Sequence, residues 1–510
     1  MKNRFPRRRV LAGALTIPLV LGLVAACSAP APDDAKGGKS LTVSIGGQPP
    51  SFDPAAADLG ESAYIWTGLY DTLLKVDVEG AIQPNAAEKW EYSADGLTLT
   101  LTLREGLTFS DDSPVTAKDV AATIDRSRTS SGVRAPDLAL VSSVEASDER
   151  TVVLTLSEGD PALLVNLATG AGIIAKASDL ENKSIALSPL ESGPYVLNDE
   201  ATSTGATYVL NRRDDYWNVD AYPYETVTVR VIEDPQARFN ALQAGELDAG
   251  NVTANQVSAM EAAGFTAKSI EAQAWGGLVF LDRKGERVPA LGDKRVRTAI
   301  AMAFDRDLYV KQLLQGAGRA TDQILNPIQA GYSADLEGYW KYDPNAAKAL
   351  LAEAGYADGI DLVMPSSYFS TRFEPAITQS LADIGVRVTW EAVPPQEVFA
   401  SLSSGKYGMA WFFEGLNAPS IMTRSSFSAK GGLNPSGYTS PELDGLFDKL
   451  SATPDIDAQV PIYEAINRHG VEDALVAPIF YSSTTWTTKP GVEFLPNGAI
   501  PIYLSSFGAK

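Results

Sequence analysis

Cysteine and histidine are almost missing from this sequence: its 510 residues contain one of each, Cys27 and His469. One cysteine cannot form a disulfide within a single chain, and a zinc site that needs several cysteines and histidines cannot assemble. The acidic residues show no spacing typical of a calcium-binding loop. We therefore predict no metal site and no cofactor, while a metal chelate carried by a small organic ligand stays open.

Positive charge is also scarce. The sequence has 42 lysines and arginines against 63 aspartates and glutamates, which gives a formal net charge of −21. Nucleic acids and anionic membrane surfaces attract basic proteins, so we expect neither of them as a partner. A chain of 510 residues exceeds a single hydrophobic core, which predicts two or three domains.

The linear motifs of several enzyme classes do not occur in the sequence. It has no G-x-S-x-G, no H-E-x-x-H and neither of the glycine-rich patterns G-x-x-x-x-G-K-[ST] and G-x-G-x-x-G. We therefore expect no catalytic residue and no enzymatic activity. A hydrolase that uses paired carboxylates stays open as an alternative, because such a pair leaves no linear motif.

The first 40 residues have the pattern of an export signal followed by a tether. Basic residues precede the mostly apolar residues 10–26, which predicts a signal peptide over residues 1–26, whether the route is Sec or twin-arginine. The string L-V-A-A-C resembles a lipobox, in which Cys27 is acylated and becomes the mature N-terminus. Residues 27–40 are rich in proline, glycine and charge and predict a tether. A retained membrane anchor is the alternative.

A strand and a helix are predicted around residue 100. Leucine alternates with threonine over residues 97–103, the pattern of a strand that is buried on one face. After a turn at residues 105–106, we expect residues 107–109 to pair back against this strand. Thr116 and Asp119 then form a capping-box pattern, which predicts the start of a helix.

The same segment, W-x-x-S-x-D-G-x-T-x-T-x-x-L-R-x-G-x-x-F-S-D-x-x-P-V-T-A-x-D-V, resembles the signature of the family 5 extracellular solute-binding proteins. These proteins serve ATP-driven importers of oligopeptides, dipeptides and nickel. Ser113 departs from the family pattern, which usually has glycine there, and we expect it to carry slight strain. Further landmarks of the family follow at residues 193–195, 213–217, 241–248 and 295–306.

The resemblance implies an α/β architecture, the type II periplasmic-binding-protein fold. This fold has two mixed α/β lobes joined by a hinge, and the family adds a further domain, which gives the three-domain cluster C type. We expect domain I over residues 41–58, 190–270 and 480–510, domain II over 59–189 and domain III over 271–479.

Helical patterns recur in the second half of the chain. Residues 293–306 have one apolar face and predict a single core helix, whose arginines we expect to be exposed or capping rather than ligand-binding. Two further helices are predicted to end at Gly355 and Gly385, the second of which leads into a strand at residues 386–390. Such units form mixed α/β sheets.

The resemblance also implies a function, that of the substrate-binding lipoprotein of an ABC importer. Such a protein captures an organic solute between its lobes and delivers it to a membrane permease that works with a cytoplasmic ATPase. We expect a peptide or peptide-like ligand, a monomer, and a location on the outer face of the cytoplasmic membrane, held there by the lipid on Cys27. A receptor lipoprotein that senses its ligand is an alternative.

The ligand site is expected in and around residues 407–420. Peptide-binding relatives have a tryptophan followed three residues later by aspartate, whose carboxylate receives the α-amino group of the ligand. Trp411 and Glu414 have this spacing. A carboxylate binds an ammonium group through a charge-assisted hydrogen bond. The expected ligand-binding residues are Glu414, Trp411, Phe412, Phe413, Trp275, Asn417 and Trp66.

An anchor for the carboxylate of a peptide is missing from its expected place. Certain relatives have an arginine a few residues before the tryptophan, whereas Gly408 stands here. Arg372 and Arg424 are possible substitutes that no motif selects. The ligand therefore stays open among dipeptides, oligopeptides, opines, sugar-like compounds and metal chelates.

Overall fold

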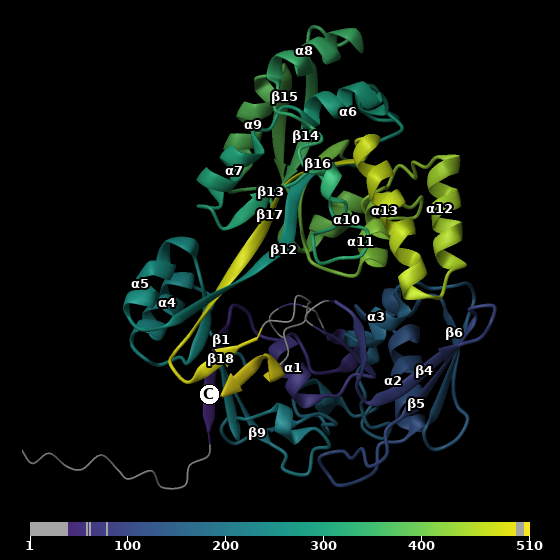
Figure 1. Cartoon of the computed structure of the whole chain (residues 1–510), viewed down its shortest axis with the longest axis vertical. Helices are drawn as coiled ribbons and strands as arrows, with labels where there is room; N and C mark the ends of the chain where they lie inside the picture. Colours follow the sequence, from purple (N-terminus) through teal and green to yellow (C-terminus); the bar gives the residue numbers. More distant parts are fainter. Residues whose placement is uncertain (1–38, 58–59, 61–62, 78–79, 496–503, 510) are drawn as a thin grey trace, which may run out of the picture. The chain divides into compact units, whose positions relative to one another are not determined.

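A computed structural model describes residues 39–57, 60, 63–77, 80–495 and 504–509 (Figure 1). The predicted signal peptide, Cys27 and all but the last two residues of the tether lie outside this part of the chain. Within the described residues, no helix combines the length and the apolar character needed to cross a membrane.

The largest sheet has nine strands in the order β16-β12-β17-β11-β1-β10-β9-β8, with β13 paired to β17 beside this path. Strand β1 pairs in parallel with β10 and β11, and the other pairs are antiparallel, so the sheet is mixed. The strands are β1 (Ser40–Ile45), β8 (Tyr195–Leu197), β9 (Thr207–Arg212), β10 (Thr226–Val231), β11 (Ala249–Val252), β12 (Thr266–Phe280), β13 (Gly318–Ala320), β16 (Met409–Gly415) and β17 (Val476–Thr488).

Strands β12 and β17 are long and run side by side through both halves of this sheet (Figure 1). Residues 266–270 of β12 pair with β17, and this part of β17 also pairs with β11. Residues 274–280 of β12 also pair with β16. The register shifts between these two stretches, at Ala272, whose φ is +52°. The chain therefore passes from one half of the sheet to the other along β12 and returns along β17.

A second, antiparallel sheet contains the segment that resembles the family signature. Its order is β4 (Ala87–Tyr92), β5 (Thr98–Leu103), β7 (Thr151–Leu156) and β6 (Val141–Ala146). The predicted strand is confirmed as β5, with Leu99, Leu101 and Leu103 buried against α2 (Ala117–Thr129). The predicted capping box is confirmed as well, since Thr116 and Asp119 form it at the start of α2.

The return strand predicted at residues 107–109 is wrong. Both edges of β5 are taken by β4 and β7, so these residues instead close a tight loop. In this loop the amide of Val115 donates to the carbonyl of Leu107 at 2.9 Å. The positive φ of the loop, +64°, belongs to Asp112, and Ser113 therefore lacks the strain that we expected of it.

A parallel pair of strands, β14 (Ile360–Ser366) and β15 (Val386–Ala392), packs beside β16. Helices α8 (Pro344–Glu353) and α9 (Glu374–Ala382) precede the two strands. The glycines that follow these helices, Gly355 and Gly385, have φ of +92° and +90°, the left-handed conformation that glycine adopts without strain. Both predicted helix ends and the predicted strand after Gly385 are confirmed.

The single helix predicted at residues 293–306 is two helices, α6 (Lys294–Ala301) and α7 (Arg306–Leu313). The arginines are expected to be exposed or capping. Arg297 and Arg306 are buried, at 2% and 7% exposure, and both donate to carbonyl oxygens at helix ends, so the capping alternative applies to them. Arg297 donates to four carbonyl oxygens, two of which lie in the turn at Asp473 and Ala474. Arg306 pairs with Asp322 at 2.7 Å. Backbone acceptors and a buried carboxylate thus replace water around both guanidinium groups.

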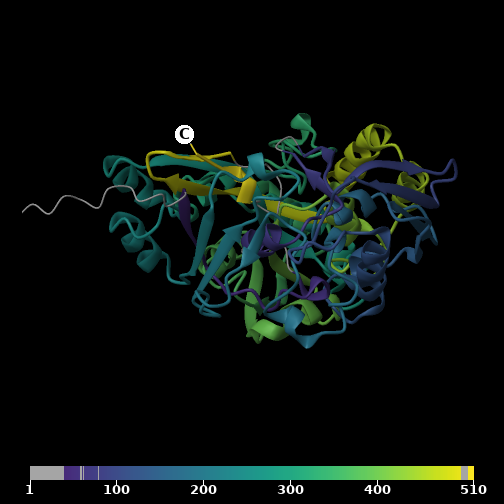
Figure 2. The same cartoon turned by 90° about the horizontal axis from the view of Figure 1, so that it is seen from below.

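Helices α4 (Pro235–Gln243) and α5 (Val257–Ala262) lie together beside the large sheet in both views, α4 against β11 and α5 against β12 and β17 (Figures 1 and 2). Short 3-10 helices occupy several loops. The remaining elements are α1 (Ala63–Leu69), α3 (Leu163–Leu167), α10 (Val398–Ser403), α11 (Pro419–Phe427), α12 (Pro441–Ser451), α13 (Ile456–Glu472), β2 (Leu74–Val76), β3 (Ile82–Pro84), β18 (Val492–Phe494) and β19 (Phe507–Ala509).

The buried side chains form separate cores. One core surrounds α1 and the strands β1, β9 and β10, a second lies under the antiparallel sheet, and two others cover the opposite faces of β12 and β16. Helix α1 therefore shares a core with strands of the predicted domain I, although the predicted domain II begins at residue 59. The domain boundaries stay predictions.

Gly277 in β12 is expected to be sensitive to substitution. A Cβ at this position would lie 2.4 Å from the carbonyl oxygen of Ala477 and 2.6 Å from the Cα of Pro478, both in the backbone of β17. Gly277→Ala should therefore destabilise the protein by about 1–3 kcal/mol, the usual cost of overpacking. The measurement is the change in Tm.

Gly445→Ala is the matched control, because nothing lies within 4 Å of a Cβ at this position in α12. It should raise stability by up to about 1 kcal/mol through helix propensity. Equal changes in Tm for the two variants would contradict the close approach of β12 and β17.

Candidate functional site

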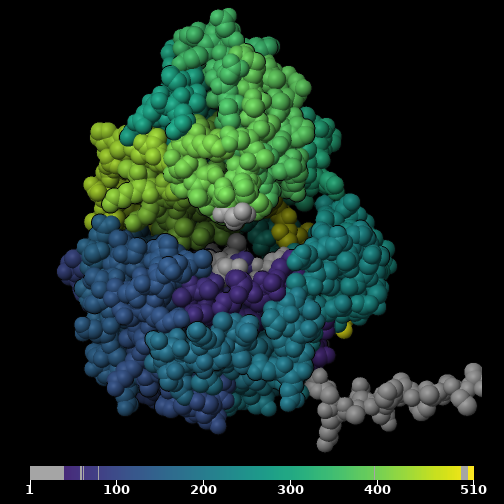
Figure 3. Space-filling view, turned by 180° about the vertical axis from the view of Figure 1, so that it is seen from behind, coloured from purple at the N-terminus to yellow at the C-terminus, as the bar shows by residue number. Residues whose placement is uncertain are grey.

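A cavity with a volume of about 610 Å³ is lined by two sets of segments that are far apart in the sequence. The view from behind shows a hollow of the surface between residues coloured green and residues coloured purple (Figure 3), whereas most of the cavity lining belongs to the blue and yellow-green parts of the chain. Most of the lining is apolar, including Trp90, Leu164 and Leu416. The lining residues are 76, 80–82, 90, 92, 96, 159–161, 164–165, 328–330, 416–420, 451, 453–457, 459 and 463.

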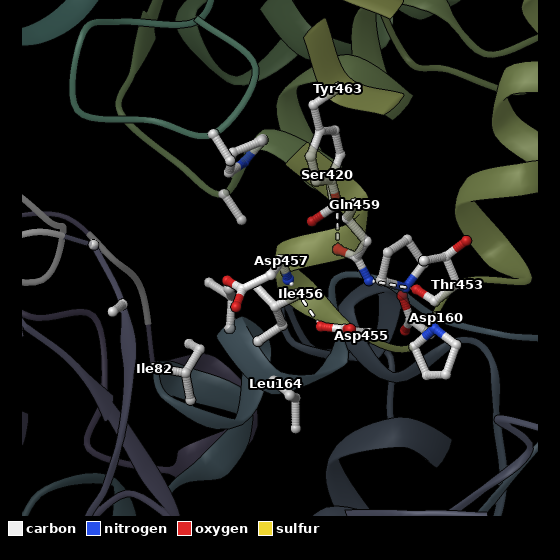
Figure 4. A pocket seen from close by; sticks show the side chains of 18 of the residues that line it. Ile82, Asp160, Leu164, Ser420, Thr453, Asp455, Ile456, Asp457, Gln459 and Tyr463 are labelled. Carbon is white, nitrogen blue, oxygen red and sulfur yellow. Dashed lines mark hydrogen bonds between the residues drawn. The ribbon is translucent and has the colours of Figure 1, made fainter. Parts of the chain in front are cut away.

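The polar side of the cavity lies at the start of α13 (Figure 4). Asp455 caps this helix by accepting from the amide of Asp457 at 3.1 Å. The amide of the Gln459 side chain donates to the carbonyl of Thr453 at 2.7 Å, and Tyr463 donates its hydroxyl to Gln459 at 3.2 Å. These bonds hold the helix start and the preceding loop in place on one wall of the cavity.

The cavity is acidic. Asp160, Asp455 and Asp457 line it, and no lysine or arginine does so among the described residues. Burial raises the pKa of Asp160, although the Ala162 amide and the charge of Arg424 act in the opposite direction. No described group of three or more His, Cys, Asp or Glu side chains is arranged to hold a metal ion. The arrangement therefore suits an organic ligand with a positive charge.

Glu414 lies next to the end of edge strand β16, directly opposite Trp275 of β12. The indole nitrogen of Trp275 donates to the Glu414 carboxylate at 2.9 Å. Burial raises the pKa of Glu414 to about 7, and the Trp275 hydrogen bond offsets only part of this effect. Glu414 does not line the cavity, whose nearest lining residue in the sequence is Leu416. This strand end thus holds a carboxyl group that is poorly hydrated and lacks a cationic partner among the described residues.

Side chains of β16 alternate between the two faces of the sheet. Trp411 and Phe413 pack on one face, where Trp411 is 1% exposed and lies 4.9 Å from the ring of Phe373. Phe412 lies on the other face with Trp275. Glu414 shares this second face, because residues two apart in a strand point the same way. The spacing of three residues therefore separates Trp411 from Glu414.

The other predicted site residues are dispersed. Asn417 lines the cavity, and its carbonyl accepts a hydrogen bond from the side chain of Gln329. Trp66 is 1% exposed and belongs to the core around α1. Arg372 stacks over the ring of Phe373 at 4.4 Å. The structure brings together Glu414, Trp275 and Phe412, and the predicted ligand-binding roles stay predictions.

Sequence reasoning missed the acidic wall of the cavity and an aromatic cluster near Phe412. The sequence indicates the acidic side of the cavity only weakly. Asp455 is a recognisable helix cap, but no feature of the sequence places Asp160 beside it. The cluster has a stronger signal. Tyr368 and Phe369 follow β14, and Phe399 follows β15, so the carboxyl ends of two parallel strands carry all three rings.

Residues 81–432 match the family described as bacterial extracellular solute-binding proteins, family 5 Middle. The match spans more than half of the chain. The chain belongs to this family. Family 5 consists of extracellular solute-binding proteins rather than enzymes, and its members work with ABC permeases. The resemblance predicted from the sequence is confirmed.

Named relatives cover most of the chain. Glutathione-binding protein GsiB of Shigella dysenteriae serotype 1 is 27% identical over 420 residues, which cover 80% of this chain and 79% of GsiB. Oligopeptide-binding protein AppA of Bacillus subtilis (strain 168) is 26% identical over 530 residues, which cover 96% of each chain.

Solved structures of family 5 proteins have the same fold. The periplasmic binding protein DppA from Helicobacter pylori, in complex with the peptide STSA, has a TM-score of 0.77 at 23% identity. The alignment covers 92% of this chain and 98% of DppA. This likeness confirms the predicted type II periplasmic-binding-protein fold.

The raised pKa of Glu414 predicts a pH-dependent stability. The folded protein keeps the proton on this carboxyl up to a pH of about 7, whereas the unfolded chain releases it near the ordinary value of 4.5. Between these values the folded state binds more protons, so stability falls as pH rises. Glu414→Gln removes the titration, and its Tm should therefore rise relative to the wild type across this window.

The measurement is the difference in Tm between wild type and Glu414→Gln from about pH 4 to about pH 8. Glu105→Gln serves as the control, because the Glu105 side chain is 83% exposed. A difference that stays constant with pH for Glu414→Gln would show that this carboxyl titrates normally.

Proposed function

We propose that this family 5 protein captures a peptide or peptide-like organic cation between two lobes and delivers it to an ABC-type permease. The single observation that carries the proposal is the cavity of about 610 Å³. It lies within the range of about 300–1,000 Å³ usual for small-molecule sites, and it has carboxylates but no lysine or arginine among the described residues that line it.

The names of the relatives support a peptide-like ligand. GsiB is a glutathione-binding protein, AppA is an oligopeptide-binding protein, and the DppA structure holds the peptide STSA. A peptide of this kind has an ammonium group at one end. Carboxylates near the cavity would attract this ammonium group, and the attraction would not depend on which side chains the peptide carries.

Glu414 is the proposed anchor for the ammonium group. Its carboxyl is poorly hydrated and receives a single hydrogen bond, from Trp275, among the described contacts. An approaching cation would stabilise the ionised form and lower its pKa. Trp275 would meanwhile hold one oxygen in place and leave the other for the ligand. Asn417 adds a carbonyl and an amide side chain on the cavity wall.

Lobe closure would use the two long strands. Strands β12 and β17 are the described strands that continue from one half of the large sheet to the other, and β12 changes register at Ala272. A change of a few backbone angles at such a point can move one lobe relative to the other. Closure would then exclude water from the ligand.

The first test combines a ligand screen with a variant of Glu414. Thermal shifts are recorded with dipeptides, oligopeptides, opines, sugars and metal chelates, since a ligand at 100 times its Kd stabilises by about 2.7 kcal/mol. For a cationic ligand found this way, Glu414→Ala should lower affinity about tenfold or more, because a hydrogen bond to a charged group contributes about 1.5–3 kcal/mol.

Glu353→Ala is a control outside the cavity, at the end of α8. It should leave the affinity unchanged. An unchanged affinity in Glu414→Ala would refute the anchor, and the lack of any thermal shift with the whole panel would refute the proposed ligand class.

We also propose that the protein is a lipid-anchored monomer on the outer face of the membrane. The L-V-A-A-C string before the tether supports acylation at Cys27. Cys27→Ala should therefore leave the protein without lipid and move it from the detergent phase to the aqueous phase in phase partitioning. Detergent-phase partitioning of Cys27→Ala, checked by mass spectrometry of the N-terminus, would contradict the lipobox.

A further inference from the structure

A cluster of four aromatic rings lies on the same side of β16 as Glu414. We define this aromatic wall as Tyr368, Phe369, Phe399 and Phe412. The rings form a connected set: Phe369 lies 4.2 Å from Tyr368, 5.9 Å from Phe399 and 5.2 Å from Phe412, measured between ring centroids.

The wall is connected to the proposed anchor. The ring of Phe412 lies 6.2 Å from that of Trp275, which donates its indole N–H to Glu414. Phe412 and Glu414 are also two residues apart in β16 and therefore point to the same face. Glu414 and the four rings are thus connected through Trp275 and Phe412, which are 1% and 6% exposed, while Glu414 itself is partly exposed. We call this connected set the surface of the wall.

The outer rings of this surface are exposed to solvent. Phe399 is 61% exposed and Tyr368 is 56% exposed, whereas Phe412 is 6% exposed. Large apolar side chains at such exposure lose hydrophobic stabilisation unless a ligand covers them. Phe369 lies between the two exposed rings, contacts both of them and is itself partly buried.

The place of the wall in the fold also favours ligand binding. Tyr368 and Phe369 follow the carboxyl end of β14, and Phe399 follows the carboxyl end of β15. The two strands are parallel, with Ser366 paired to Ala392 at their ends, so both loops lie at one edge. Ligands of open α/β sheets bind at this edge.

The charge of the surface selects the kind of ligand. None of the cation–ring contacts among the described residues involves a ring of the wall. The nearest arginine in the sequence, Arg372, stacks over Phe373, whose ring packs against Trp411 on the other face. The wall therefore offers aromatic faces beside a carboxylate, which attracts a cation and gives no anchor to an anion.

We infer that this surface binds an organic ammonium whose charged group is attached directly to an aromatic or aliphatic body, such as a peptide with an apolar first residue. The ammonium group pairs with Glu414, and the apolar body covers Phe412, Phe399 and Tyr368. This inference rests on the proposed function, because it names the class of solute taken at the proposed anchor Glu414. Neither Glu414 nor any of the four rings belongs to the lining of the cavity, whose nearest lining residue after Glu414 in the sequence is Leu416.

Isothermal titration calorimetry with three probes tests the inference. Phenylalanyl-phenylalanine amide has both features, its N-acetyl derivative lacks the ammonium group, and glycylglycine amide lacks the apolar body. The first probe should bind at least tenfold more tightly than either of the others. Equal affinity for the acetylated probe, equal affinity for the glycine probe, or no binding of the first probe would each overturn the inference.

Two variants of exposed residues test the wall itself. Tyr368→Ala and Phe399→Ala should each weaken binding of phenylalanyl-phenylalanine amide about fivefold or more, with little change in Tm because both side chains are exposed. Tyr339→Ala is the matched control, since Tyr339 is 46% exposed and stacks on Trp340 away from the wall. Unchanged affinity in both wall variants would overturn the inference.

The result separates this inference from the proposed function. If another solute of the thermal-shift panel binds and phenylalanyl-phenylalanine amide does not, the aromatic wall is refuted and solute capture stands. If no solute and none of the three probes binds, both are refuted.

Discussion

The pairing of β12 with β17 is the constraint on which the rest of the structure depends. The ladder runs through both halves of the large sheet: one half adds β11 beside β17, and the other adds β16 beside β12 and β13 beside β17. A Cβ at Gly277 would meet the backbone of β17, and a Cβ at Gly276 would meet the ring of Phe480. Because β16 pairs with β12, the same ladder fixes the register that sets Glu414 opposite Trp275.

This register places a charge where water is scarce. A carboxylate in such a position is costly unless hydrogen bonds or a cation replace its water. Trp275 supplies one hydrogen bond, and the pKa of Glu414 is still raised to about 7. The site is therefore incomplete electrostatically, in contrast to Arg297, whose guanidinium is surrounded by four carbonyl contacts.

Local features could be predicted from the sequence, and contacts between distant segments could not. The alternating strand at β5, the capping box of α2 and the glycine that ends α8 depend on residues within a few positions of each other. The partners of Arg297 could not be predicted, because its carbonyl acceptors at Asp473 and Ala474 lie more than 170 residues away. Trp411 and Glu414 were both expected to bind the ligand, and in the strand their spacing of three residues sends the two side chains to opposite faces.

The family signature and the determinants of ligand choice lie in different parts of the chain. The signature forms β5 and the start of α2, where leucines and a capping box serve packing alone. The aromatic wall and Glu414 lie after strands β14 and β15 and on β16, positions that the signature does not constrain. Substitutions of the exposed rings, Tyr368 and Phe399, can change the shape offered to a ligand without disturbing either core of the sheet. A shared family therefore predicts the fold and the capture of a solute, whereas the kind of solute has to be read from the side chains at these strand ends.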